Sequence, residues 1–292
     1  MTFILAPVVS LLYVCRGIFK MLISYLIVIL SYAFIRLCWN WRTESWPEKS
    51  IILEPYQVHR GYWIEGHKEN SISAFREAKI RGAKMIELDV HLSQDEQPVV
   101  HHDGSFLVDQ SNIKLKINSL TANELLSKAN IPSLEQVLRD NLCPSKINIE
   151  LKASGIKNIG LEKAVCEIVI NTQSQHRVLF SSFNPICLMR LSKILPDVPR
   201  ALLVSNEKKD PKNKIYLRQM WLGFLAKPHM VNLNYKMLTP FLIRRLNERK
   251  IPIAVWTVND ETQALLLQNK GVVSIITDTY PLIKNLEPVN VN

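Results

Sequence analysis

The sequence lacks the patterns that mark disulfide scaffolds, zinc sites and nucleic-acid-binding domains. Its five cysteines, at positions 15, 38, 143, 166 and 187, are an odd number and form no C-x-x-C pair, which argues against both a disulfide framework and a zinc site. There is no arginine- and lysine-rich run with interleaved aromatic residues and no recognition motif, so nucleic acid is disfavoured as a partner. These absences favour a globular protein of a reducing compartment, or one that is indifferent to redox conditions.

The N-terminal region is strongly apolar but lacks a signal-peptide cleavage site. Met21 to Ile35 is a run of fifteen uncharged, mostly apolar residues, and no small-x-small site follows it. Lys20 and Arg36 can snorkel and extend the run toward the roughly 20 residues that span a bilayer, while Trp39 suits the membrane interface. We therefore expect an uncleaved membrane anchor rather than a signal peptide.

A second apolar run, from Phe3 to Val14, leaves open whether the region crosses the membrane once or twice. Arg16 and Lys20 on one side of the main run balance Arg36 and Arg42 on the other, so the charges do not fix the orientation. We slightly favour a cytoplasmic position for the remainder of the chain.

Length and charge describe that remainder further. The 292 residues suit one barrel-sized domain with an appendage, and the formal net charge is +10. Positions 51–292 hold 31 basic and 24 acidic residues, so most of the basic excess belongs to the folded part. This balance favours anionic partners such as phosphorylated substrates or lipid head groups.

The densest chemistry lies in the strand-like segment from Lys84 to Leu92, which carries two carboxylates in an otherwise apolar run. Alternate strand side chains share a face, so Glu87 and Asp89 should project side by side. Two like charges held together raise one another's pKa or share a cation. A divalent ion with oxygen ligands, Mg²⁺ or Ca²⁺, is the simplest resolution.

Strand-like runs alternate with helical ones from Gln57 onward, which predicts a (β/α)₈ TIM barrel of the α/β class. After a first strand ending at His59, we expect main strands at 85–91, 98–101, 146–151, 178–181, 200–204, 252–257 and 273–277, with Val231 to Leu233 as an extra short apolar piece. Active sites of such barrels lie at the carboxyl ends of the strands. His59, the Glu87 and Asp89 pair, His102, Glu150 with Lys152, and Trp256 all fall at or beyond those ends.

Five short motifs in this order resemble the glycerophosphodiester phosphodiesterase family: His59-Arg60-Gly61, Glu69-Asn70-Ser71, Glu87-Leu88-Asp89, Ser93-Gln94-Asp95 and His102-Asp103. Each motif is weak alone, and the ordered set is strong. Serine stands where the family usually has threonine at positions 71 and 93, which is a chemically mild change. The resemblance covers residues 57–284 and implies a TIM barrel of the phospholipase-C-like phosphodiesterase type.

The resemblance also implies roles. Glu87, Asp89 and Glu150 would bind one divalent cation, Mg²⁺ or Ca²⁺, and His59 and His102 would act as acid and base. Arg60, Lys152, Glu69 and Trp256 would contact the substrate. Without the resemblance, Glu150-Leu151-Lys152 would pass for a surface ion pair, a lone histidine for a structural one, and Glu69-Asn70-Ser71 for a helix cap.

The expected activity is hydrolysis of glycerophosphodiesters to sn-glycerol 3-phosphate and an alcohol. Lysophospholipids, cleaved as by a lysophospholipase D, are the alternative substrates, and phosphatidylinositol-specific phospholipase chemistry fits the carboxylate motif less well. The non-enzymatic alternative is a membrane-tethered phosphate-binding module with a degenerate site. Residues 106–110 depart from the family pattern beside the pocket, which leaves the substrate preference open. The sequence does not give the oligomeric state.

These expectations divide the chain into four parts: a membrane anchor at 1–40, a juxtamembrane linker at 41–56, the barrel at 57–284 and a tail at 285–292. Within the barrel, Lys208 to Lys227 has an apolar stripe with basic residues at its margin. A barrel helix after strand 200–204 is the favoured interpretation, and a helix resting on anionic lipid is the alternative.

Overall fold

The computed structural model describes residues 5–108, 113–153, 155, 160–207 and 214–281, with side chains from position 18 onward and at position 16. The chain forms two compact units, Met1–Trp41 and Arg42–Asn292. The predicted tail at 285–292 lies outside the described residues.

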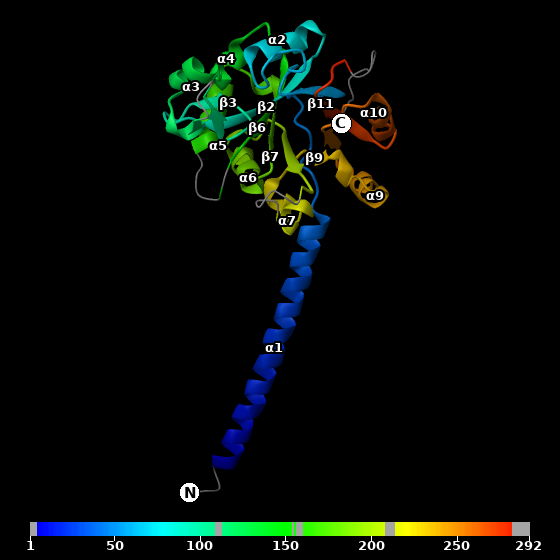
Figure 1. Ribbon diagram of the computed structural model, residues 1–292. Helices are drawn as coiled ribbons and strands as arrows, with labels where there is room; N and C mark the ends of the chain where they lie inside the picture. The colour runs from blue at the N-terminus through cyan, green and yellow to red at the C-terminus, as the bar shows by residue number, and fades with distance from the viewer. Residues whose placement is uncertain (1–4, 109–112, 154, 156–159, 208–213, 282–292) are drawn as a thin grey trace. The chain divides into compact units, whose positions relative to one another are not determined.

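The first unit is one long helix, α1 (Leu5–Asn40) (Figure 1). Its stretch Ile18–Asn40 has 23 residues with a mean hydropathy of 2.2, and no residue of its most apolar part is buried. At 1.5 Å per residue this stretch is about 35 Å long, enough to cross a hydrocarbon core of about 30 Å. Its length and composition fit a membrane anchor, and they fit an N-terminal signal sequence equally.

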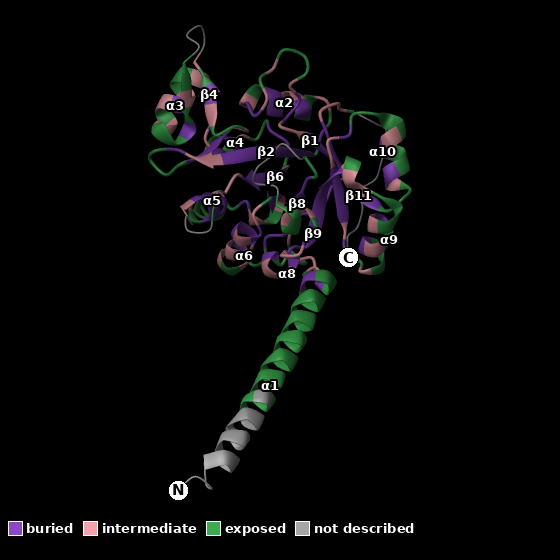
Figure 2. Ribbon diagram, turned by 60° about the horizontal axis from the view of Figure 1, so that its bottom comes forward, coloured by how far each residue is buried: buried purple, intermediate pink, exposed green. Residues whose placement is uncertain are grey.

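The second unit is a closed barrel of eight parallel strands, as predicted. The strands run in the order β1-β11-β10-β9-β8-β7-β6-β2, and pairing between β1 and β2 closes the ring. Their bounds are Tyr56–His59 (β1), Met85–Leu92 (β2), Lys146–Leu151 (β6), Val178–Ser182 (β7), Arg200–Val204 (β8), Met230–Asn234 (β9), Ile253–Trp256 (β10) and Val272–Thr277 (β11). Figure 2 shows these strands buried at the centre of the unit, as expected for a sheet covered by helices.

Helices follow the strands and surround them (Figure 1). They are α2 (Ile72–Ile80), α3 (Ala122–Ala129), α4 (Leu134–Arg139), α5 (Gly160–Asn171), α6 (Pro185–Ile194), α7 (Ile215–Arg218), α8 (Gly223–Ala226), α9 (Pro240–Glu248) and α10 (Glu261–Gln268). Their starts follow local chemistry. Ser71 caps α2 by accepting a bond from the Ala74 amide, and Gly82, at a φ of 87°, stands just beyond the helix end.

The membership of the barrel corrects the sequence prediction. The segment predicted at 98–101 is β3 (Pro98–Val100), which pairs antiparallel with the distal end of β2 and lies outside the ring. The supposed extra piece at 231–233 belongs to β9, a full barrel strand between β8 and β10. Glu150 therefore stands on the third barrel strand, directly beside β2, rather than on the fourth.

A small lobe follows β3 and has its own core. It contains the hairpin β4 (Ser105–Leu107) and β5 (Lys114–Lys116), the helix α3 and part of the chain leading to α4. Val99, Phe106, Ile117, Leu125 and Ile131 form its buried cluster. The apolarity of the 98–101 segment thus reflects packing under this lobe.

Most of the segment predicted as a linker at 41–56 is packed on the barrel, because residues 42–55 cross its amino-terminal end. Ile51 and Leu53 are 1 % and 0 % exposed, and they cluster with residues near the starts of five barrel strands. The Trp46 indole donates to the Ile51 carbonyl at 2.9 Å, and its ring meets the His229 ring edge-on at 6.1 Å. The segment closes the end of the barrel that faces away from the strands' carboxyl ends.

The segment predicted as one helix at 208–227 is not a single helix. Residues 208–213, which include three of its lysines, lie outside the described residues. The rest forms two one-turn helices, α7 and α8, separated at Met220, whose φ of 55° is incompatible with a continuing helix. The predicted continuous apolar stripe is therefore interrupted.

His229 gives the barrel a pH-dependent stability. Its Nδ1 accepts a hydrogen bond from the Arg200 amide at 3.0 Å, and burial together with the Arg200 guanidinium lowers the pKa of His229 to about 3. The unfolded chain, with a histidine pKa near 6.5, binds this proton more readily than the folded chain. Stability is therefore fully present above about pH 6.5 and is lost as the pH falls toward 3, by about 2 kcal/mol between pH 7 and pH 5.

Urea unfolding of wild type and of His229→Asn at both pH values measures this loss. Asparagine keeps an acceptor but cannot titrate, so the variant should lose about 2 kcal/mol less than wild type over the interval. Equal losses in both proteins would contradict the assignment.

Candidate active site

Three carboxylates meet at the carboxyl end of the barrel strands. Asp89 on β2 lies directly opposite Glu150 on β6, and Glu87 precedes Asp89 by two residues on the same face of the strand. The three side chains are buried, with residue exposures of 4 % for Glu87, 1 % for Asp89 and 7 % for Glu150. One oxygen from each lies within 4.8 Å of the others, so the side-by-side projection predicted from sequence is present.

Two cations lie against these carboxylates. The Lys152 Nζ lies 2.7 Å from Asp89 Oδ1 and 2.6 Å from Glu150 Oε1, and the Arg60 Nε lies 3.3 Å from Asp89 Oδ2. Burial opposes ionisation of Asp89, but Lys152 and Arg60 outweigh it and lower the pKa of that carboxyl. Burial, and then the charges of Asp89 and Glu150, raise the pKa of Glu87. The cluster is thus short of positive charge at Glu87.

The donor set is compatible with a divalent cation. All three side chains offer carboxylate oxygens, which are the ligands preferred by Mg²⁺ and Ca²⁺. Three carboxylates against two neighbouring cations leave a net charge of about −1, and a divalent ion would bring it to about +1, opposite in sign to a phosphodiester.

His59, the last residue of β1, is held by a carboxylate that the sequence analysis assigned no role. Its Nδ1 lies 2.7 Å from Asp278 Oδ1, just after β11, and its Nε2 lies 4.0 Å from Glu87 Oε2. Asn259 donates to Asp278 Oδ2 at 2.8 Å and accepts from the Asp278 amide at 2.8 Å. Because a carboxylate accepts, the His59 proton sits on Nδ1 and its Nε2 lone pair is left toward the carboxylate cluster.

His102 reaches the site on the loop after β3 rather than on a barrel strand. The His101 amide donates to the Asp89 carbonyl at 3.0 Å, which ties this loop to β2. The His102 Nδ1 lies 2.9 Å from Asp103 Oδ1, so this ring also keeps its Nε2 lone pair. Burial and the charge of Lys152 lower the pKa of His102.

The ring of His101 packs edge-on against Phe106 at 6.4 Å, and its Nδ1 donates to the Asp103 carbonyl at 2.8 Å. His101 is therefore engaged by the lobe that follows β3, as expected for a histidine on the opposite face from His102.

Glu69 and Asn70 form hydrogen bonds with groups that line the site. The Arg60 guanidinium donates to Glu69 Oε2 at 2.9 Å, so Glu69 contacts Arg60. Asn70, at a φ of 56°, donates to Asp89 Oδ2 at 2.8 Å and accepts from the Asp89 amide at 3.2 Å. Both interactions fix neighbours of the carboxylate cluster, in addition to the helix cap formed by Ser71.

Trp256 ends β10 on the opposite side of the barrel. Its indole donates to the Asn232 carbonyl at 3.2 Å, and its ring meets that of Phe183 edge-on at 5.8 Å. This pair places aromatic surface at the ends of β7 and β10.

Asp95, which is part of the family resemblance, lies in the turn after β2. Its carboxylate accepts hydrogen bonds from the Ser93 hydroxyl and the Ala122 amide, and so stabilises that turn.

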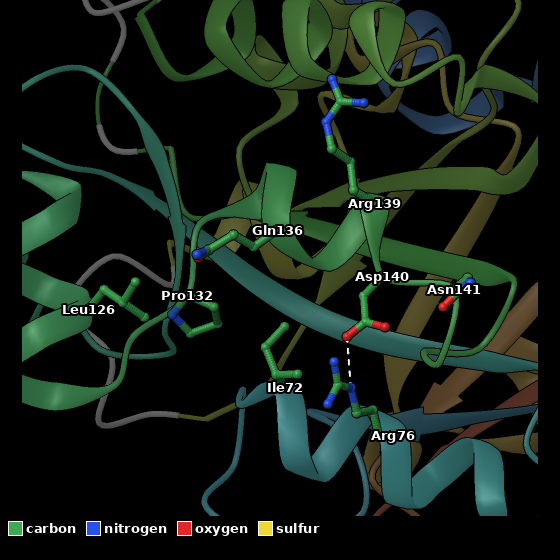
Figure 3. Close-up of a pocket in the computed structure, with 8 residues that line it drawn as sticks. All are labelled: Ile72, Arg76, Leu126, Pro132, Gln136, Arg139, Asp140 and Asn141. Atoms are coloured by element: carbon green, nitrogen blue, oxygen red, sulfur yellow. Dashed lines mark hydrogen bonds and ion pairs between the residues drawn. The ribbon is translucent and has the colours of Figure 1, made fainter.

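A groove of about 480 Å³ lies between α2, α3 and α4 and is not lined by Glu87, Asp89 or Glu150 (Figure 3). Its Arg76 bonds Asp140 at 2.8 Å across the groove, and its Arg139 bonds Glu135 at 2.9 Å. Because these charges already neutralise one another, the groove offers no free charged group comparable to the site at the strand ends.

Comparisons with known proteins show which family the chain is similar to. The family model described as the glycerophosphoryl diester phosphodiesterase family matches residues 59–281. A glycerophosphodiester phosphodiesterase of Bacillus altitudinis is 32% identical over 235 residues, 76% of this chain and 93% of the relative. A lysophospholipase D of Mus musculus is 26% identical over 281 residues, 80% of this chain and 86% of the relative.

Solved structures give the same fold. A phosphodiesterase of Oleispira antarctica, solved in complex with the product sn-glycerol-3-phosphate, has a TM-score of 0.61 and 25% identity, covering 79% of this chain and 94% of that one. A structure from Silicibacter pomeroyi has a TM-score of 0.65 at 18% identity, with coverages of 79% and 91%, and supports the fold alone.

Proposed function

The chain belongs to the glycerophosphoryl diester phosphodiesterase family and is an enzyme of that class, and from this membership we propose that it hydrolyses glycerophosphodiesters to sn-glycerol 3-phosphate and an alcohol. The observation that carries the proposal is the buried cluster of Glu87, Asp89 and Glu150, whose oxygens lie within 4.8 Å of one another. Lys152 and Arg60 offset two of these buried negative charges, and a cationic ligand would offset the third.

Glu87, Asp89 and Glu150 would bind one divalent cation, Mg²⁺ or Ca²⁺. Such an ion supplies positive charge to the phosphate oxygens and orients the phosphate. Lys152 and Arg60, which already lie against Asp89, supply further charge for the non-bridging oxygens as negative charge develops there. Glu69 keeps the Arg60 guanidinium in place through its 2.9 Å bond.

His59 and His102 would exchange the protons. One imidazole accepts a proton from the attacking hydroxyl, which belongs either to water or to the neighbouring glycerol carbon of the substrate, as oxygen bonds to phosphorus. Attack by the glycerol hydroxyl would first give a cyclic phosphate, which a water molecule would then open to sn-glycerol 3-phosphate. The phosphorus–oxygen bond to the alcohol breaks, and the other histidine, protonated, donates its proton to the departing alkoxide. Both rings suit this exchange because their Nδ1 atoms are committed to Asp278 and Asp103.

Trp256 and Phe183 would wall the pocket on the side facing the leaving alcohol. Phe183 is 37 % exposed, so an apolar part of a substrate could cover it. The exposed ring of Phe183 favours lysophospholipids as a second substrate class, in keeping with the similarity to the lysophospholipase D of Mus musculus. We also propose that α1 anchors the enzyme in a membrane, with the barrel on the cytoplasmic side.

Turnover assays of the full-length protein in detergent test the function. Glycerophosphocholine, glycerophosphoethanolamine and lysophosphatidylcholine would each be supplied with Mg²⁺ or Ca²⁺, and the phosphorylated product identified. Release of sn-glycerol 3-phosphate from the first two supports the proposal, and faster release of lysophosphatidate from the third favours the lysophospholipase D alternative. No phosphomonoester from any substrate with either cation would refute both.

Asp278 offers a test of how His59 is oriented. Asp278→Asn keeps the size of the side chain but can present an N–H to the His59 Nδ1, which favours the wrong tautomer. We expect kcat to fall on the order of tenfold to a hundredfold with little change in KM. Asp260→Asn, at the cap of α10, is the matched control and should keep wild-type activity. Equal activity of Asp278→Asn and wild type would show that His59 is oriented by other contacts.

A further inference from the structure

His91 lies on the same face of β2 as the metal-binding candidates, two residues beyond Asp89. At this level β2 has left the barrel ring and pairs with β3, so that His91 lies opposite Val99. The sequence motifs assign nothing to this histidine. Its surroundings are the loop that carries His102.

The His91 ring is hydrogen-bonded to the main chain of the proposed acid/base residue. Its Nε2 lies 2.9 Å from the His102 carbonyl oxygen. A carbonyl can only accept, so the proton of His91 sits on Nε2 and the ring acts as the donor. The bond thus fixes both the tautomer of His91 and the position of the His102 carbonyl.

The loop from His101 to Gly104 gains order from such a contact because the carboxylate that bonds the His102 ring is exposed to solvent. The carboxylate of Asp103, which bonds the His102 ring, has a side chain that is 72% exposed, and a solvent-exposed pair of this kind contributes little order. The loop ends are held by main-chain bonds, from the His101 amide to Asp89 and from the Ile117 amide to Gly104. Between these two points, the His91 ring bonds the His102 carbonyl and the His101 ring bonds the Asp103 carbonyl, and only the first of these bonds comes from β2.

We propose that His91 is a positioning residue that sets the distance between the His102 ring and the carboxylate cluster. The strand that presents Asp89 also presents His91, so one rigid element places the cation-binding oxygens and the loop that must work beside them. An error of about 1 Å in the position of a reacting group costs on the order of a hundredfold in rate. His91 acts through His102 and need not touch the substrate.

This inference rests on the proposed function. Its test is a series of variants of the full-length enzyme, assayed in detergent with glycerophosphocholine. His91→Leu removes the donor, and kcat should fall on the order of tenfold to a hundredfold with KM within about twofold of wild type. His91→Gln can replace the N–H donor and should recover to within about fivefold of wild type. His176→Leu, a histidine of the amino-terminal side of β7, should have wild-type activity.

A double-mutant cycle separates positioning from a general structural effect. With His102→Ala as the background, His91→Leu should cause no further loss, because the group that it positions is gone. A full additional loss in this background, a wild-type kcat for His91→Leu, or no recovery in His91→Gln would each overturn the inference. A wild-type chain that cleaves none of the substrates named above would refute the proposed function and the inference with it.

Discussion

Glu150→Gln is expected to lower turnover by about 10³-fold, because it removes one of the three proposed anionic ligands and so weakens cation binding. We take the cation to stabilise the transition state by about 4 kcal/mol, and about 1.36 kcal/mol corresponds to each factor of ten in rate. The Glu150 carboxylate lies opposite Asp89 in the strand register and contacts Lys152 at 2.6 Å. Glutamine has nearly the same shape as glutamate, so the substitution changes mainly the charge at this position. Excess chelator should have an equal effect on wild type, and added cation should reverse it.

The stability of this variant gives a second measurement that does not depend on activity. Burial raises the pKa of Glu150, so its ionised form is disfavoured in the folded protein, and a neutral glutamine should not lower the melting temperature of the cation-free protein. The rise in melting temperature that Mg²⁺ or Ca²⁺ causes in wild type should largely vanish in the variant.

Glu162→Gln is the matched control for loss of a buried carboxylate. Glu162 is 0 % exposed and bonds Arg190 at 3.2 Å on the outer helices, away from the strand ends. This variant should keep the cation-induced stabilisation and the turnover per folded molecule. Full activity of Glu150→Gln in excess chelator would remove the cation from the proposal altogether.

The fold was predictable from sequence where the apolar residues of a strand are buried by the barrel itself. The strand at 200–204 has the bounds expected from sequence, since a central parallel strand reads as a short apolar run. The strand at 146–151 also has its expected bounds, and its apolar residues alternate with Lys146, Asn148 and Glu150. The same rule misassigned two segments. Residues 98–101 are apolar because the lobe covers them, and β9 was undervalued because Asn232 and Asn234 interrupt its apolar run while pointing into the barrel. Apolarity reports burial but does not say which neighbour buries a strand.

The candidate site was predictable to the extent that its residues occur as short motifs. Glu87 and Asp89 share a strand, and the two-residue period alone places them together. Asp278 is 219 residues from His59, and only closure of the barrel through β1 and β11 brings the two into contact. Its signal in the sequence was a carboxylate directly after the last strand, at the barrel end where active sites lie. The sequence does not show which histidine Asp278 contacts, because this depends on the strand register of the closed barrel.

The second large effect is expected for His102→Ala, which should lower kcat by about 10²–10⁴-fold, the usual contribution of a general acid or base. The imidazole is held by Asp103 and lies close enough to Lys152 for the ammonium charge to lower its pKa. Its loop is tied to β2 through the His101 amide, a main-chain bond that the substitution leaves intact. Cation binding and the unfolding transition should therefore stay close to wild type.

His101→Ala is the matched control on the adjacent residue. Its ring packs on Phe106 in the lobe and bonds the Asp103 carbonyl, so its removal should cost some stability of the lobe but leave kcat within a few-fold of wild type, about 1 kcal/mol at most. Steady-state kinetics on glycerophosphocholine, with thermal unfolding of each variant, measure the contrast. Equal losses of kcat in the two variants would mean that the loop as a whole, rather than the His102 ring, serves the reaction.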